Sequence, residues 1–123
     1  MSETVNDHTF ENLEIWQEAI ELAAHVYELF RECRDFEFRG QIQAAAASVS
    51  NNIAEGYERD SNQELIRFAI IAKGSCGEVR SQAYLARRVQ LLPEEKATPL
   101  IAEAKRLSKR ISRFVEVRRE KFG

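Results

Sequence analysis

The chain contains few of the residues that interrupt, kink or cross-link a fold. Its 123 residues include two prolines, five glycines and two cysteines. The cysteines, Cys33 and Cys76, are too few and too far apart for a disulfide framework or a zinc site. We expect both thiols to be reduced, in a cytoplasmic protein. No stretch sustains the alternation of a strand, so the sequence predicts an all-α protein.

Long apolar runs and a strong net charge are also absent. No run approaches the roughly 20 apolar residues that a membrane span requires. Residues 1–9 lack the apolar core of a signal peptide. The net charge of −2 gives no global field that would attract nucleic acid or an anionic membrane. A chain of this length is expected to form one domain around one hydrophobic core.

An uncharged stretch from Gln41 to Ala54 stands out in a sequence that is otherwise rich in charge. It contains four consecutive alanines, and alanine is the strongest helix former. At about 100° per residue its large apolar residues fall on one side, which predicts a buried helix. The residues on that side are Ile42, Ala46, Val49 and Ile53.

A polar ladder runs beside this apolar side. Ser48, Asn52 and Glu55 follow one another at helical spacing. Buried amides and carboxylates need hydrogen-bond partners. We expect Ser75 and Glu78 of a following helix to supply them, in a structural polar network that sets the register of the two helices. A ligand or metal site at the same residues is the alternative interpretation.

Start and stop signals divide the chain into a flexible tail, residues 1–11, and four helices. Asn12 has the side chain of an N-cap, and Ser61 with Glu64 has the spacing of a capping box. Thr98 followed by Pro99 is typical of a helix start. The predicted helices cover about residues 12–34, 40–56, 62–90 and 98–121. The short connections predict an antiparallel up-down-up-down four-helix bundle, a single domain over residues 12–122.

The first predicted helix carries two apolar series. One has the alternating spacing of three and four that is typical of a bundle core: Leu13, Trp16, Ile20, Ala23, Tyr27 and Phe30. Together the two series span an arc of roughly 220°, whereas a surface helix needs an apolar stripe of only about 100° or somewhat more. The excess predicts that the second series is buried against another copy of the chain. This predicted oligomer interface comprises Ile15, Ala19, Leu22, Val26 and Leu29.

Two glycines fall inside the third predicted helix. Gly74 and Gly77 each cost about 1 kcal/mol relative to alanine in a helix interior. We expect the cost to be tolerated because small residues there let the second helix, which is equally small-sided, approach closely.

Charge is distributed unevenly along the chain. Residues 1–38 hold ten acidic and two basic side chains, and residues 98–123 hold eight basic and three acidic ones. These faces could simply be solvated, or could attract each other within or between subunits. Alternatively, a basic face on the last helix binds RNA or DNA phosphates without sequence preference. The cations of that face are Lys105, Arg106, Lys109, Arg110 and Arg113.

Catalytic and metal-binding patterns are not found in the sequence. The two histidines, His8 and His25, do not form the Glu-x-x-His motif of carboxylate-bridged metal sites in bundles. The segment from Gly74 to Gly77 lies inside a predicted helix, not in a phosphate-binding loop between strand and helix. The sequence therefore predicts no enzyme, no metal and no cofactor.

Several landmarks resemble one known family, the bacterial four-helix-bundle proteins related to those encoded in 23S ribosomal RNA intervening sequences. The most diagnostic segment is Asn52 to Gly56. The resemblance covers nearly the whole chain, from Phe10 to about Phe114. The matching residues are Phe10 to Leu13, Ile15 to Gln17, Ala19, Gln41-Ile42, Ser48 to Tyr57, Arg67-Phe68, Ala72, Gly74-Ser75 and Glu78.

The resemblance implies a four-helix bundle that assembles as a homopentamer. It also points to a relative, the accessory variability protein of diversity-generating retroelements, which is basic and is associated with a reverse transcriptase and nucleic acid. Family members often carry arginines just after the Gln41-Ile42 position, where this chain has Gln43 and Ala44. Many also carry a proline at the position of Ser50. The missing arginines weaken the transfer of nucleic-acid binding to this chain.

These observations favour a non-enzymatic, oligomeric bundle that acts as a scaffold or adaptor. Its predicted partner is itself. The alternative hypothesis is a nucleic-acid-binding accessory factor that uses the basic face of the last helix, for RNA or RNA and DNA, with a reverse transcriptase as a possible partner.

Overall fold

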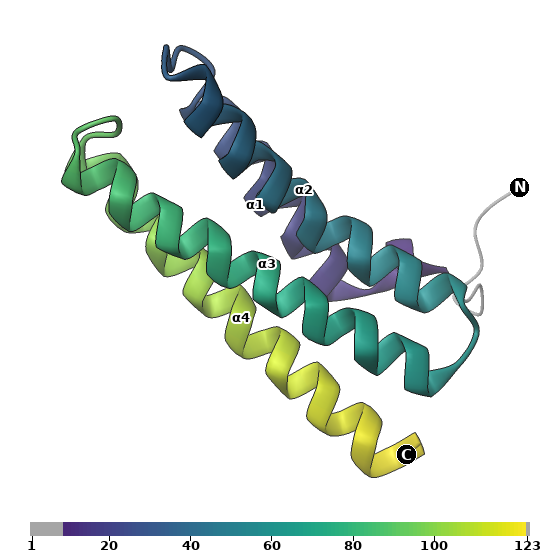
Figure 1. Ribbon diagram of the computed structural model, residues 1–123. Helices are drawn as coiled ribbons and strands as arrows, with labels where there is room; N and C mark the ends of the chain where they lie inside the picture. The colour runs from purple at the N-terminus through teal and green to yellow at the C-terminus, as the bar shows by residue number, and fades with distance from the viewer. Residues whose placement is uncertain (1–8, 123) are drawn as a thin grey trace, which may run out of the picture.

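The computed structural model describes residues 9–122 as four helices preceded by one short turn (Figure 1). Residues 1–8 of the predicted flexible tail, including His8, lie outside the described residues. The elements are a 3-10 turn η1 (Phe10–Asn12) and the helices α1 (Glu14–Leu29), α2 (Phe36–Glu58), α3 (Asn62–Arg88) and α4 (Glu94–Phe122). The all-α class is therefore confirmed.

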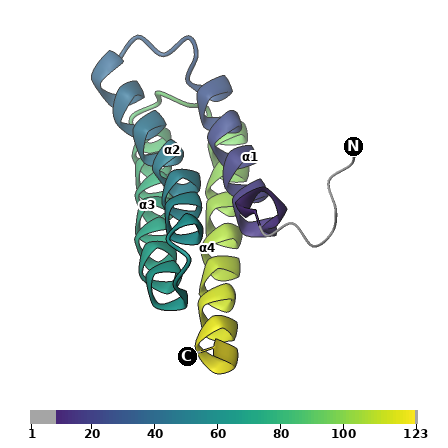
Figure 2. The same cartoon turned by 90° about the vertical axis from the view of Figure 1, so that its right-hand side faces the viewer.

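The helices form an antiparallel up-down-up-down bundle. The α1–α2 and α3–α4 connections lie at one end of the bundle, and the α2–α3 connection lies at the other (Figure 1). Each helix packs against its two neighbours, so that α1 touches α2 and α4, and α3 touches the same two helices from the opposite corner (Figure 2). One continuous cluster of buried side chains from all four helices fills the centre. None of the helices in the described range is long and apolar enough to cross a membrane.

Local capping explains where the middle helices begin. Ser61 Oγ accepts a hydrogen bond from Glu64 N at 3.2 Å, as the capping-box spacing predicts. The Glu64 carboxylate turns instead to Arg59 and Arg67. Helix α2 begins at Phe36, four residues before the predicted start, because Asp35 Oδ1 accepts from Phe38 N at 3.1 Å and caps it.

The two outer helices differ from their predicted limits. The N-cap of α1 is Leu13 rather than Asn12, and the helix ends at Leu29 instead of residue 34. Helix α4 begins at Glu94, so Pro99 lies inside it and Thr98 is not its cap. Burial of Ala97 beside Leu100 in the core stabilises this extra turn despite the proline.

The core of the single chain takes both apolar series of α1 rather than one, and leaves only part of the first series exposed. Four of the five residues predicted to face another copy are buried in the core of the single chain, and the fifth is half-buried: Ile15, Ala19, Leu22, Val26 and Leu29. In the other series, Ile20 and Tyr27 are 38% and 48% exposed, although they were predicted to lie in the core. The predicted oligomer interface on α1 is therefore wrong.

Burial of the second series accounts for this rotation, because Leu22 and Val26 are fully buried in the core. Ion pairs between α1 and α4 are compatible with it. Glu18 pairs with Arg110 at 2.8 Å, and His25 Nδ1 lies 2.9 Å from Glu103 Oε1. These pairs are partly exposed and contribute little by themselves. A helical wheel of α1 shows two apolar series but not which of them the other helices cover, so it cannot fix this rotation.

The close approach of α2 to α3 occurs at a different glycine from those predicted. A Cβ atom built on Gly56 would lie 2.7 Å from Phe68 Cβ and 3.2 Å from Leu65 Cα, so no larger residue fits. At Gly74 and Gly77 an added Cβ would meet no described atom within 4 Å. These two glycines therefore do not serve the packing of α3 against α2.

Candidate functional site

The predicted basic face of α4 is divided between two neighbouring helices. Arg110 binds Glu14 and Glu18 of α1 at 2.9 and 2.8 Å, and Arg106 lines a hollow with acidic residues of α1 and α4. Arg113 pairs with Glu116 of its own helix at 3.2 Å. Much of the positive charge of this face is therefore neutralised by carboxylates of the same chain. Only Lys105 and Lys109 lie towards α3.

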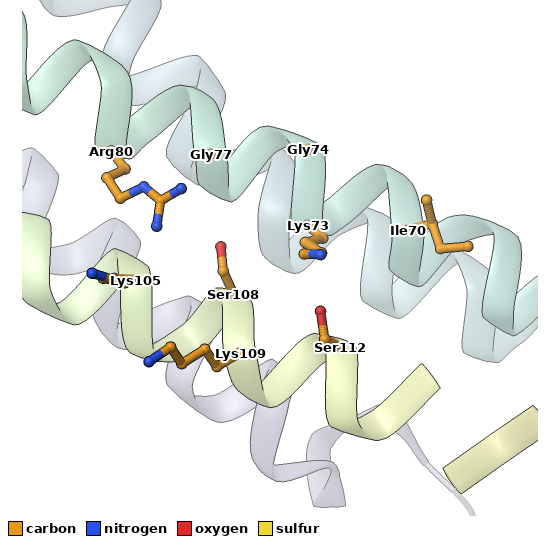
Figure 3. Close-up of a pocket in the computed structure, with 9 residues that line it drawn as sticks. All are labelled: Ile70, Lys73, Gly74, Gly77, Arg80, Lys105, Ser108, Lys109 and Ser112. Atoms are coloured by element: carbon orange, nitrogen blue, oxygen red, sulfur yellow. The ribbon is translucent and has the colours of Figure 1, made fainter. Parts of the chain in front are cut away.

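Lys105 and Lys109 form one wall of a groove between α3 and α4 (Figure 3). Lys73 and Arg80 of α3 form the other wall, and the groove has a volume of about 500 Å³. We call this feature the basic groove. It is lined by Ile70, Lys73, Gly74, Gly77, Arg80, Lys105, Ser108, Lys109 and Ser112.

The basic groove carries four formal positive charges and its lining includes no carboxylate. Within residues 9–122, none of its four cations forms an ion pair. Like charges gathered in a concave surface raise the local potential and attract anions. Figure 3 shows the guanidinium of Arg80 pointing into the space between the helices, towards Ser108.

Hydroxyl groups and bare backbone complete the lining of the basic groove. Ser108 is only 9% exposed, and Ser112 lies one turn further along α4. Opposite them, Gly74 and Gly77 leave the surface of α3 without side chains. The cations and hydroxyl groups suit the oxygens of an anion, and the two glycines leave room for it beside them.

Sequence reasoning missed the contribution of α3 to this site. Lys73 and Arg80 are seven residues apart, which places both on one edge of the helix. Their spacing was visible in the sequence, but the edge that faces α4 was not. The five predicted cations contribute two members to the basic groove, and the other three lie elsewhere on α4.

The predicted polar network forms in part. Ser48 Oγ and Ser75 Oγ lie 2.9 Å apart, which joins α2 to α3. Asn52 Nδ2 donates to Ser48 O and Oγ at 2.8 and 2.9 Å. Glu55 is exposed and binds Arg59, and Glu78 is also exposed. Neither carboxylate belongs to the network, so the structural interpretation holds for Ser48, Asn52 and Ser75.

The thiols and acidic groups form no reactive cluster in the described part of the chain. Among residues 9–122 no three His, Cys, Asp or Glu side chains gather as metal ligands. Cys76 is buried and its Sγ donates to Ala104 O at 3.2 Å. Burial raises the pKa of this thiol, which keeps it protonated and unreactive.

Comparisons with known proteins agree with this architecture. A crystal structure of a protein of unknown function from the S23 ribosomal protein family of Bacteroides thetaiotaomicron superimposes with a TM-score of 0.77. The two sequences are 19% identical, and the match covers 82% of this chain and 97% of the other. This likeness concerns the fold. No curated protein sequence matches the chain significantly.

The sequence profile of one family covers most of the chain. Residues 11–113 match the family described as 23S rRNA-intervening sequence protein. This range contains α1, α2 and α3 in full and most of α4. The chain therefore belongs to the 23S rRNA-intervening sequence protein family.

Proposed function

We propose that the protein is a non-enzymatic, cytoplasmic scaffold or adaptor that works as a homo-oligomer. The observation that carries this proposal is the exposure of large apolar side chains on two different helices. Ile20 and Tyr27, seven residues apart, share one face of α1. They belong to the series that the single chain leaves only partly covered.

The second apolar surface lies on α3. Ile71, Leu85 and Val89 are 41%, 51% and 53% exposed. At about 100° per residue they lie on one side of the helix, about 120° or more away from Lys73 and Arg80. We propose that another copy of the chain covers these side chains, two of which lie on α3 and one at its C-cap.

The two surfaces are different, which favours a head-to-tail contact. In such a contact the α1 surface of one copy meets the α3 surface of the next. Contacts of this type close into a ring when the rotation between copies fits. The family resemblance implies five copies, so we propose a homopentamer.

Light scattering behind size exclusion at micromolar concentration tests this proposal. Five copies of the 14.2 kDa chain have a mass of about 71 kDa. A 14.2 kDa monomer under these conditions would contradict the proposal.

A matched pair of variants locates the contact. The double variant Ile71→Glu/Leu85→Glu places charge on the α3 surface and is expected to lower the particle mass. Phe36→Glu changes a 70% exposed side chain at the start of α2, outside both surfaces, and should leave the mass unchanged. An equal loss of mass in both variants would argue against a contact at α3.

A second candidate function is a nucleic-acid-binding accessory factor. The observation that favours it is the set of cations in the basic groove that have no acidic partner in the described chain. Titration of labelled structured RNA at low and moderate salt tests it, because phosphate contacts weaken as salt rises. Absence of binding even at about 50 mM salt would remove this candidate.

A further inference from the structure

We propose that the basic groove between α3 and α4 is a binding site for paired phosphate groups. The ligand is either a diphosphate group of a small molecule or two neighbouring phosphates of an RNA strand. The site stands independently of the homo-oligomer, and only its RNA form rests on the second candidate function.

The placement of the cations favours two phosphates over one. Lys73 and Arg80 are seven residues apart, or about 10 Å along α3, and Lys105 and Lys109 are about 6 Å apart along α4. Because the helices are antiparallel, Arg80 lies opposite Lys105, and Lys73 lies opposite Ser112 (Figure 3). The four cations therefore line the groove over a longer span than one phosphate covers, which suits two neighbouring phosphates of a strand. A diphosphate, whose two phosphates share one oxygen, would lie at the centre of the groove, where the long side chains of both walls reach it.

The surroundings of the groove keep its charge available. The acidic residues of α1 are engaged on the other side of α4, where Arg110 binds Glu14 and Glu18. The cations of the groove have no such partners among residues 9–122. Their charge is therefore available to an anion from outside the chain.

The glycines add an independent argument. Gly74 and Gly77 lie in the middle of α3, where glycine weakens a helix. Among the described residues no atom lies within 4 Å of where their Cβ atoms would be. Because Gly74 and Gly77 have no side chains, a ligand has room between α3 and the serines Ser108 and Ser112 of α4 (Figure 3).

Calorimetric titration with inorganic pyrophosphate at low salt tests the site. We expect Lys73→Gln/Lys109→Gln to weaken binding by at least about tenfold, since two charge-assisted contacts are lost. The matched control Arg106→Gln/Arg113→Gln removes the same charge from the other faces of α4 and should change affinity by less than about twofold. Equal losses in both variants, or no binding by the wild-type protein, would overturn the proposal.

A second variant separates the site from general charge effects. Gly77→Leu fills the basic groove without changing any charge, and its Cβ would meet no atom of the described residues within 4 Å. We expect it to keep the melting temperature and lose pyrophosphate binding. Retention of full affinity by this variant would contradict a ligand seated against α3. Circular dichroism confirms that each variant is folded.

A parallel titration with a short single-stranded RNA distinguishes the two possible ligands, a small molecule with a diphosphate group and an RNA strand. RNA that competes with pyrophosphate, and that binds the groove variant more weakly, identifies the strand as the ligand. Pyrophosphate binding without RNA binding identifies a small phosphorylated molecule. In that case the second candidate function fails while the phosphate site stands.

Discussion

The contacts of α3 with α2 and with α4 both contain glycine and serine, but they use these small residues in opposite ways. On the side of α2, Gly56 brings the helices so close that a Cβ atom would lie 2.7 Å from Phe68 Cβ. Ser75 on this side is bonded to Ser48. On the side of α4, Gly74 and Gly77 face a groove, and Ser108 and Ser112 line it.

This difference shows that composition does not reveal whether a small residue packs or stays open. Glycine and serine near the middle of a helix suit a close helix contact and a ligand surface equally well. The relative rotation of the neighbouring helix decides between them. Here α2 places a glycine against α3, whereas α4 places lysines beside it.

The largest expected effect comes from adding a side chain at Gly56, where α2 and α3 are in close contact. We call this contact the tight side of α3, and the surface that faces the basic groove the open side. Gly56→Ala should lower the free energy of unfolding by about 1–3 kcal/mol, because overpacking against the Leu65 backbone outweighs the better helix propensity of alanine. Urea denaturation measures the change. An unchanged or higher stability would show that α2 and α3 are not in close contact at this point.

The hydroxyl pair on the tight side gives the next largest effect. Ser75→Ala removes the partner of Ser48 and should cost about 1 kcal/mol. Ser112→Ala on the open side is the matched control and should stay within about 0.5 kcal/mol of the wild type. Chemical denaturation of both variants compares the two sides directly, and equal losses would remove the distinction between them.

Filling the open side should act in the opposite direction from filling the tight side. Gly77→Ala is expected to raise the free energy of unfolding by about 0.5–1 kcal/mol, because alanine favours the helix and its Cβ meets no described atom within 4 Å. The same denaturation series as for Gly56→Ala measures it. Destabilisation by this change would show that α3 and α4 are packed more closely at Gly77 than the structure indicates.

The smallest expected effect concerns the far side of α4, where His25 meets Glu103. The hydrogen bond to Glu103 raises the pKa of His25 above its ordinary value of 6.5. A raised pKa in the folded state means that the contact stabilises below about pH 6.5 and that this stabilisation is lost as pH rises through the folded value. The half-exposed pair should contribute less than about 1 kcal/mol.

The pH dependence of unfolding checks this contact. His25→Gln should be less stable than the wild type at about pH 5.5 and equal to it at about pH 8.5. Lys109→Gln, in the basic groove, should show no such dependence. A pH-independent difference for His25→Gln would indicate that the contact does not depend on the charge of the imidazole.

The sequence predicted the fold well because its strongest patterns are local. The apolar side of α2, from Ile42 to Ile53, and the Ser61 cap of α3 lie as predicted. The rotation of α1 could not be predicted, since it depends on which of its two apolar series the neighbouring helices cover. For the same reason the basic face was assigned to α4 alone, although half of the cations in the groove belong to α3.

Thermal unfolding with increasing pyrophosphate tests most directly whether the α4 side of α3 is a binding surface. A ligand that binds only the folded state stabilises it by RT ln(1 + L/Kd), where L is the free ligand concentration, so the melting temperature keeps rising with the logarithm of ligand concentration after the site is full. We predict a concentration-dependent rise for the wild type and for Gly56→Ala, and a rise in Lys73→Gln/Lys109→Gln that requires at least about tenfold more pyrophosphate. A wild-type melting temperature that does not respond, or an equal rise in the groove variant, would contradict the account.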